Sequence, residues 1–118
     1  GTRFVSSEES PVHENFKGAI VNGSEQGTYI LNKKSKPCIR ALKTDLTEKI
    51  YEEGQMDMSA LGGIKDLYFG GDMNAAPALA GQSIGLINKV MPVEEIIKQT
   101  MQEFNTVCDT LTNSKFEL

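Results

Sequence analysis

The first residues whose types could bind a ligand are Gly1, Thr2 and Arg3 at the start of the chain. A glycine that follows a strand exposes backbone N–H groups, and a threonine beside it adds a hydroxyl donor, a combination that suits a phosphate. Gly-Thr pairs also occur in ordinary turns, so the motif alone identifies no site. These residues predict a turn, fed by a preceding strand, that can hold an anion.

The second group lies in GGDMNAAPALAGQSIG, residues 70–85. Here Gly81 and Gly85 flank Gln82 and Ser83, two uncharged hydrogen-bonding side chains in an otherwise apolar stretch. One interpretation is close helix packing, because glycine and alanine let two backbones touch. The other is a flat ligand whose polar edge Gln82 and Ser83 would reach. Composition alone favours close packing.

The remaining reactive residues form no catalytic or metal-binding pattern. His13 is the sole histidine and lacks a Ser, Cys or carboxylate in a triad arrangement, so it is predicted to be a surface or helix-capping residue. Cys38 and Cys108 are far apart, with no CxxC motif, and are expected to be reduced and buried. We assign no catalytic residue and no metal site.

Composition limits the class of protein. The chain has 118 residues, which fits one domain spanning 1–118, and 39% of them are hydrophobic. A net charge of −4 argues against a nucleic-acid surface. No apolar run approaches the roughly 18 residues of a membrane span, and no signal peptide is recognisable. We therefore expect a cytoplasmic protein that binds neither nucleic acid nor membrane.

Hydrophobic periodicity and turn residues predict the elements that would position these groups. The fold class expected is α+β, mainly helical, with about five helices and a two-stranded β element. The expected helices are 11–22 with Ser10 as N-cap, a helix capped by Asp45 or Thr47 and ending at Gly54, then 57–69, 74–88, and a long helix from Pro92 with an apolar stripe. The expected strands, 28–32 and 38–42, form a hairpin around a basic turn with Lys33, Lys34 and Lys36.

The order GTRF, ESPVH, RALK, GD and AGQS resembles the C-terminal third of the nitronate monooxygenase family, formerly called 2-nitropropane dioxygenases. That family includes the type II FMN-dependent enoyl-acyl-carrier-protein reductases. The resemblance runs from Gly1 to about Leu111. It implies a TIM barrel with a small helical domain inserted near its end, and such barrels bind phosphate at their last loops. By this resemblance the chain is the C-terminal fragment of that flavoprotein, including the inserted domain, without the upstream barrel strands.

The resemblance also implies roles for individual residues. Gly1 and Thr2 would contact the FMN phosphate, while Gly81, Gln82 and Ser83 would lie beside the flavin ring and substrate. Ala80 is a weaker neighbour, and Gly71 and Asp72 would be structural. The family's catalytic histidine lies in the upstream barrel, and His13 does not correspond to it.

The function that the resemblance implies is that of an FMN-dependent oxidoreductase similar to nitronate monooxygenase, which oxidises nitronates with flavin and oxygen. One alternative is an enoyl-acyl-carrier-protein reductase that passes hydride from NAD(P)H through FMN, which CIRALKTDLTEKIYEEG favours. Another is a stand-alone helical interaction domain. The parent enzyme would act on a small molecule, whereas this chain alone is expected to bind little FMN, to be inactive, and to self-associate or dock to the missing barrel.

Overall fold

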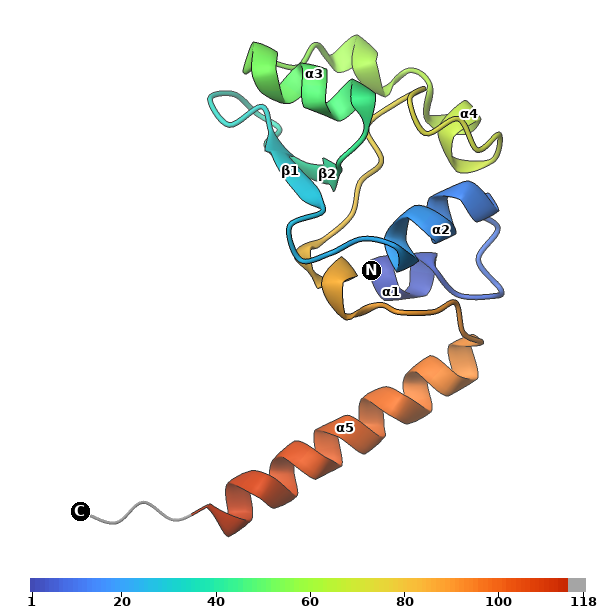
Figure 1. The fold of residues 1–118 in the computed structure, drawn as a ribbon, viewed down its shortest axis with the longest axis vertical. Coiled ribbons are helices and arrows are strands. Elements are labelled where there is room, and N and C mark those ends of the chain that lie inside the picture. Colours follow the sequence, from blue (N-terminus) through green and yellow to red (C-terminus); the bar gives the residue numbers. More distant parts are fainter. Residues whose placement is uncertain (115–118) are drawn as a thin grey trace, which may run out of the picture.

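Five α-helices and one two-stranded sheet make up the computed structural model, which describes residues 1–114 (Figure 1). The predicted mainly helical α+β class is confirmed. The α-helices are α1 (Thr2–Val5), α2 (Glu14–Val21), α3 (Asp45–Glu53), α4 (Ile64–Tyr68) and α5 (Val93–Asn113); two 3-10 helices are η1 (Met58–Leu61) and η2 (Gln82–Leu86); the strands are β1 (Thr28–Leu31) and β2 (Ile39–Leu42).

The predicted hairpin is confirmed. β1 and β2 pair antiparallel, with Thr28 opposite Leu42 and Leu31 opposite Ile39. The segment at 78–80 runs along the other side of β2, because Leu42 N donates to Ala78 O (2.8 Å) and Ala80 N donates to Arg40 O (3.3 Å). β2 thus lies between β1 and the segment that leads into η2.

Helix α2 starts later than the sequence predicted. Ser10 is not its N-cap; its hydroxyl accepts only from Val12 N at 3.4 Å. The N-cap is His13, whose Nδ1 accepts from Asn15 N at 3.0 Å. An imidazole nitrogen here replaces the hydroxyl or carboxylate oxygen of common caps. The capping role predicted for His13 is confirmed.

Helix α3 is capped by Thr44, so neither Asp45 nor Thr47 is the N-cap. Thr47 is the other half of a capping box: Thr44 Oγ1 accepts from Thr47 N (3.2 Å) and Thr47 Oγ1 accepts from Thr44 N (2.8 Å). The helix ends at Gly54 as predicted, in the left-handed conformation with φ of 76°.

Two predicted helices are wrong in part or whole. The stretch 57–69 splits into η1 and α4 at Gly62 and Gly63. Gly63 also lies close to another backbone, since a Cβ there would stand 2.1 Å from Ala75 O. The stretch 74–88 is no α-helix; it is extended beside β2 and then makes the short turn η2. Its alanines are small because Ala76, Ala78 and Ala80 are buried against other elements. These alanines do pack closely, but not as part of a helix, so the first of the two interpretations is correct only in the closeness of the packing.

Two hydrophobic clusters hold the body of the molecule together. The larger joins α2, α4, β2 and the 76–87 segment; its buried members are Phe16, Ile20, Leu42, Leu67, Ala76, Ala78, Ala80, Ile84 and Ile87. The smaller lies between the hairpin and α3 and comprises Leu31, Ala41, Ile50 and Met56. The second cluster attaches α3 to the hairpin, and the first attaches both to the N-terminal helices.

Helix α5 projects away from this body (Figure 1). The predicted long helix is confirmed, with Glu94 and Glu95 in its first turn, where negative charge is favoured. Its only buried residue is Ile96. Most of the predicted apolar stripe is exposed instead: Ile97, Met101, Phe104, Val107 and Leu111.

Neither cysteine lies in a hydrophobic cluster of the fold. Both cysteines are free, but Cys38 is exposed and Cys108 half-buried, so their predicted burial is wrong. Cys38 follows the hairpin turn, and Cys108 lies on the uncovered part of α5, so neither reaches a hydrophobic cluster. Within residues 1–114 no helix is long and apolar enough to cross a membrane, and no three His, Cys, Asp or Glu side chains gather as a metal site.

Candidate functional site

The two segments that the sequence analysis proposed for ligand binding, GTR and AGQS, lie side by side in the structure. Gly81 N donates to Thr2 Oγ1 at 2.9 Å, although 79 positions separate the two residues. Helix α1 and η2 are in direct contact around this bond. The structure therefore brings the GTR and AGQS motifs into one place, which we call the Thr2–Gly81 junction (residues 1–3 and 81–83).

Gly1 is the N-cap of α1 and does not lead into an open turn. Its carbonyl accepts from Phe4 N at 3.0 Å and from Val5 N at 3.1 Å. The expected turn is thus the first turn of a short helix. The amides of Thr2 and Arg3 at its start have no intrahelical acceptor, as geometry requires.

Open space surrounds the backbone of Gly81. A Cβ built there would have only Thr2 Oγ1 (3.5 Å) and Ser83 Oγ (3.9 Å) within 4 Å. Gly81 therefore faces two hydroxyl oxygens and is not tightly packed against other side chains or backbone. The Thr2 hydroxyl accepts one hydrogen bond and keeps its own proton to donate. These features suit a group that accepts hydrogen bonds, such as a phosphate oxygen.

Gln82 and Ser83 are both exposed at the start of η2. Neither side chain has a hydrogen-bond partner among residues 1–114. Ser83 lines an open hollow of about 390 Å³ between η2 and α5, together with Arg3 and Leu86. The side chain of Leu86, which lines this hollow, is 83% exposed.

Arg3 has a positioning role that the sequence did not predict. Its guanidinium donates from Nη1 to Lys89 O at 3.0 Å and from Nη2 to Met91 Sδ at 2.7 Å. These bonds tie α1 to the segment between η2 and α5, and Glu8 N adds another by donating to Met91 O at 3.0 Å. Its place in the GTR motif gave no signal of this role, because the acceptors are a backbone carbonyl and a thioether.

His13 and Gly71 form a separate structural contact. Gly71 has φ of 75°, and a Cβ there would stand 2.4 Å from His13 Nδ1. Asn15 Nδ2 also donates to Gly71 O at 2.9 Å. Asp72 Oδ1 accepts from Asn74 N at 3.0 Å and shapes the following turn. Both residues of the GD pair thus hold chain segments in place.

The described residues contain no nucleophile–base pair. The two titratable groups with shifted pKa values have structural causes. Burial raises the pKa of Tyr68, whose ring stacks on Phe16 at 5.1 Å between centroids. A hydrogen bond from Ser59 N to the Asp57 carboxylate lowers the pKa of Asp57, which caps η1.

Comparison with known proteins identifies the relatives of this chain. The family model described as nitronate monooxygenase matches residues 1–103. Among solved structures, FabK from Thermotoga maritima superposes with a TM-score of 0.86 at 32% identity, over 95% of this chain and 38% of that one. A methionine-to-alanine variant of FabK gives 0.81 at 34% identity, over 95% and 35%. A search of curated protein sequences gives no match. The chain spans little more than a third of the length of these FabK chains.

Proposed function

Because the chain belongs to the nitronate monooxygenase family of flavin-dependent oxidoreductases, we propose that it supplies the phosphate-side part of an FMN site. The observation that carries the proposal is the Thr2–Gly81 hydrogen bond, which unites the two motifs the family resemblance assigns to the cofactor. Gly1 and Thr2 would hold the FMN phosphate. Gly81, Gln82 and Ser83 would lie beside the isoalloxazine ring and the substrate.

Bound FMN supplies the redox chemistry, and the protein's part is to bind and orient it. In this chain the Thr2 hydroxyl has a proton to donate, and the unpaired side chains of Gln82 and Ser83 are free to bond a polar ring edge. The described residues supply no proton-transfer group at the junction.

Two substrates fit this proposal. The family model favours oxidation of a nitronate with flavin and oxygen. The likeness to FabK, together with the α3 region, favours the reductase reaction, in which hydride from NAD(P)H passes through FMN to an enoyl thioester. Stopped-flow reduction of the flavin in the complete enzyme separates them, because rapid reduction by NAD(P)H is expected only of the reductase.

Flavin binding tests the proposed site directly. We expect the 118-residue chain to bind FMN no tighter than about 10 µM, since a half-site lacks most of the ring contacts, but to prefer FMN to riboflavin because the phosphate contacts are present. Changes in the amide chemical shifts of Thr2, Arg3 and residues 81–83 in two-dimensional NMR spectra would measure the binding of each flavin. Thr2→Val should remove the preference, whereas Thr44→Val, away from the junction, should keep it. Submicromolar binding, or equal shifts by both flavins, would contradict the proposal.

We also propose that the exposed stripe of α5 is an association surface. Five large apolar side chains at 50–68% exposure form one face, and such faces rarely stay free in water. The stripe would dock to the barrel portion of the enzyme, or in the isolated chain to a second copy.

Sedimentation velocity tests this second proposal. The sedimentation coefficient of the 118-residue chain should rise with concentration, and Phe104→Ser should reduce the rise. Phe69→Ser is the matched control, because Phe69 is equally exposed, at 62%, but lies beyond α4. A monomer at all concentrations would contradict self-association.

A further inference from the structure

Positive charge is concentrated in one part of the chain. Residues 26–44, here called the cationic hairpin, hold five of the twelve Lys and Arg residues and no Asp or Glu. The remaining residues carry a formal charge of −9, although the whole chain carries only −4. The five cations are Lys33, Lys34, Lys36, Arg40 and Lys43.

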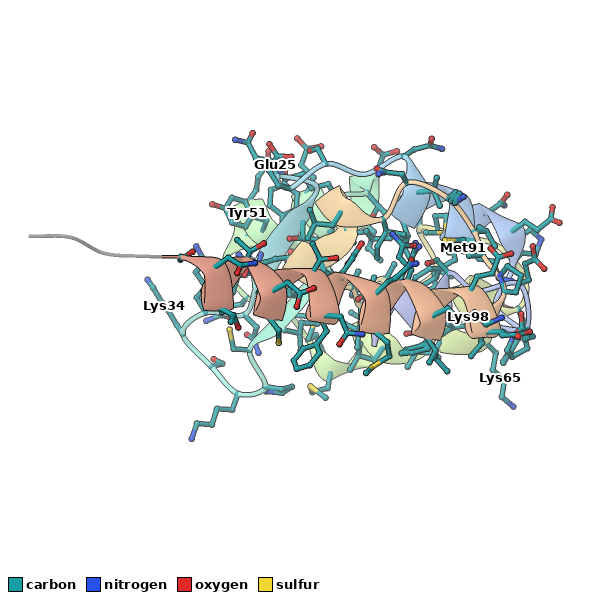
Figure 2. All side chains as sticks on the ribbon, turned by 90° about the horizontal axis from the view of Figure 1, so that it is seen from below. Glu25, Lys34, Tyr51, Lys65, Met91 and Lys98 are labelled. Carbon is teal, nitrogen blue, oxygen red and sulfur yellow. The ribbon has the colours of Figure 1, made fainter. Side chains whose placement is uncertain are left out.

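The fold keeps these charges unneutralised. Among residues 1–114 the one ion pair within 4.0 Å joins Lys98 to Glu94 on α5. No described carboxylate approaches the cationic hairpin that closely, although acidic residues outnumber basic ones in the chain. Figure 2 shows Lys34 at the opposite end of the molecule from Lys65 and Lys98. The hairpin is therefore a separate positive region on an acidic protein.

A stacked pair of tyrosines lies among the cations. The rings of Tyr29 and Tyr51 are 4.5 Å apart at 18°. Lys43 Nζ lies 4.9 Å from the Tyr29 centroid, and Lys33 Nζ lies 5.4 Å from that of Tyr51. Cation–π contacts of this kind limit the motion of otherwise flexible lysines. The rings and the two ammonium groups thus form one partly ordered surface.

The surface is hollowed along β1. An open depression of about 370 Å³ is lined by both tyrosines and by Lys33, Arg40 and Lys43. Arg40 is fixed there, because its Nη1 donates to Thr28 Oγ1 at 2.9 Å. Rigid tyrosine and arginine side chains are enriched at the centres of protein–protein interfaces.

We propose that the cationic hairpin docks an acidic segment of another protein. The five charges are spread over residues 33–43, and three of them (Lys33, Arg40 and Lys43) line the open depression. This spread matches carboxylates distributed along a polypeptide better than a single phosphate. A long nucleic acid is disfavoured because the rest of the chain would repel it. The proposal does not depend on flavin binding.

Fluorescence anisotropy with a labelled oligoglutamate peptide of about a dozen residues tests this surface. We expect the 118-residue chain to bind it with an affinity that falls as salt rises. The triple variant Lys33→Gln, Lys34→Gln and Lys36→Gln should lose about tenfold or more in affinity. The control variant Lys65→Gln, Lys89→Gln and Lys98→Gln has the same net charge and should lose less than about threefold.

Three results would overturn the proposal. The first is no peptide binding at low salt. The second is an equal loss in both triple variants, which would mean that net charge alone governs binding. The third is equally tight binding of an oligothymidylate, pyrophosphate or vesicles of anionic lipid, which would mean that the hairpin binds any anion. Tyr51→Leu gives an independent measure, because loss of the stacked ring should weaken peptide binding while circular dichroism stays unchanged.

Discussion

Helices α2 and α5 are both amphipathic, yet they have opposite relations to the rest of the molecule. The eight residues of α2 bury Phe16 and Ile20 completely, whereas the 21 residues of α5 bury only Ile96. The sequence of α5 has the clearer apolar stripe. Periodicity therefore identifies a helix and its apolar face, but it does not indicate which part of a protein covers that face.

The two phenylalanines give the strongest test of this difference. Phe16 is 0% exposed in the larger cluster, and Phe104 is 59% exposed on α5. Phe16→Ala should lower the free energy of unfolding by about 3–5 kcal/mol, because it leaves a cavity. Phe104→Ala should change it by less than about 0.5 kcal/mol. Urea denaturation at low protein concentration measures both, and similar losses would mean that α5 is packed in solution.

A smaller effect is expected at the glycine that supports the start of α2. Gly71→Ala should cost about 3 kcal/mol, because alanine is strained at positive φ and its Cβ would displace the His13 ring that caps α2. Gly54→Ala isolates the strain, since Gly54 has a similar φ of 76° but nothing within 4 Å. That control should cost about 1–2 kcal/mol. If the two variants lost equal free energy of unfolding in urea denaturation, the contact with His13 would not contribute to the effect of Gly71→Ala.

The start of α5 should show the smallest effect. Val93 N donates to the Glu9 carboxylate, at 2.8 Å to Oε2 and 3.2 Å to Oε1, and α5 has no other side-chain cap. Glu9→Ala should cost about 1 kcal/mol or less and should increase amide hydrogen exchange in the first turn of α5. Glu8→Ala is the matched control, because only its backbone reaches this region. Unchanged exchange in Glu9→Ala would show that the cap contributes nothing.

The sequence by itself determined the elements whose signals are local. The hairpin, the end of α3 at Gly54 and the whole of α5 follow from alternation, helix-stopping glycine and apolar periodicity, which act between neighbours in the chain. Motif order also determined the family. The sequence failed where the signal was not local: small residues at 74–88 resembled a helix, but the segment 78–80 forms hydrogen bonds with β2 and the chain then turns into η2.

Only the tertiary structure decided how the candidate site is assembled. The family resemblance assigns Thr2 and Gly81 to one cofactor, but no local pattern in the sequence predicts their direct hydrogen bond. Arg3 also holds α1 against the segment after η2, which only the fold shows. The sequence also identified Lys33, Lys34 and Lys36 only as a basic turn. Tyr51, which lies against Lys33, and Tyr29 come from different elements, and folding alone places the two rings against each other. Contacts between distant segments have no local signature in the sequence. They depend on which surfaces the whole fold buries together, and not on the residues that are neighbours along the chain.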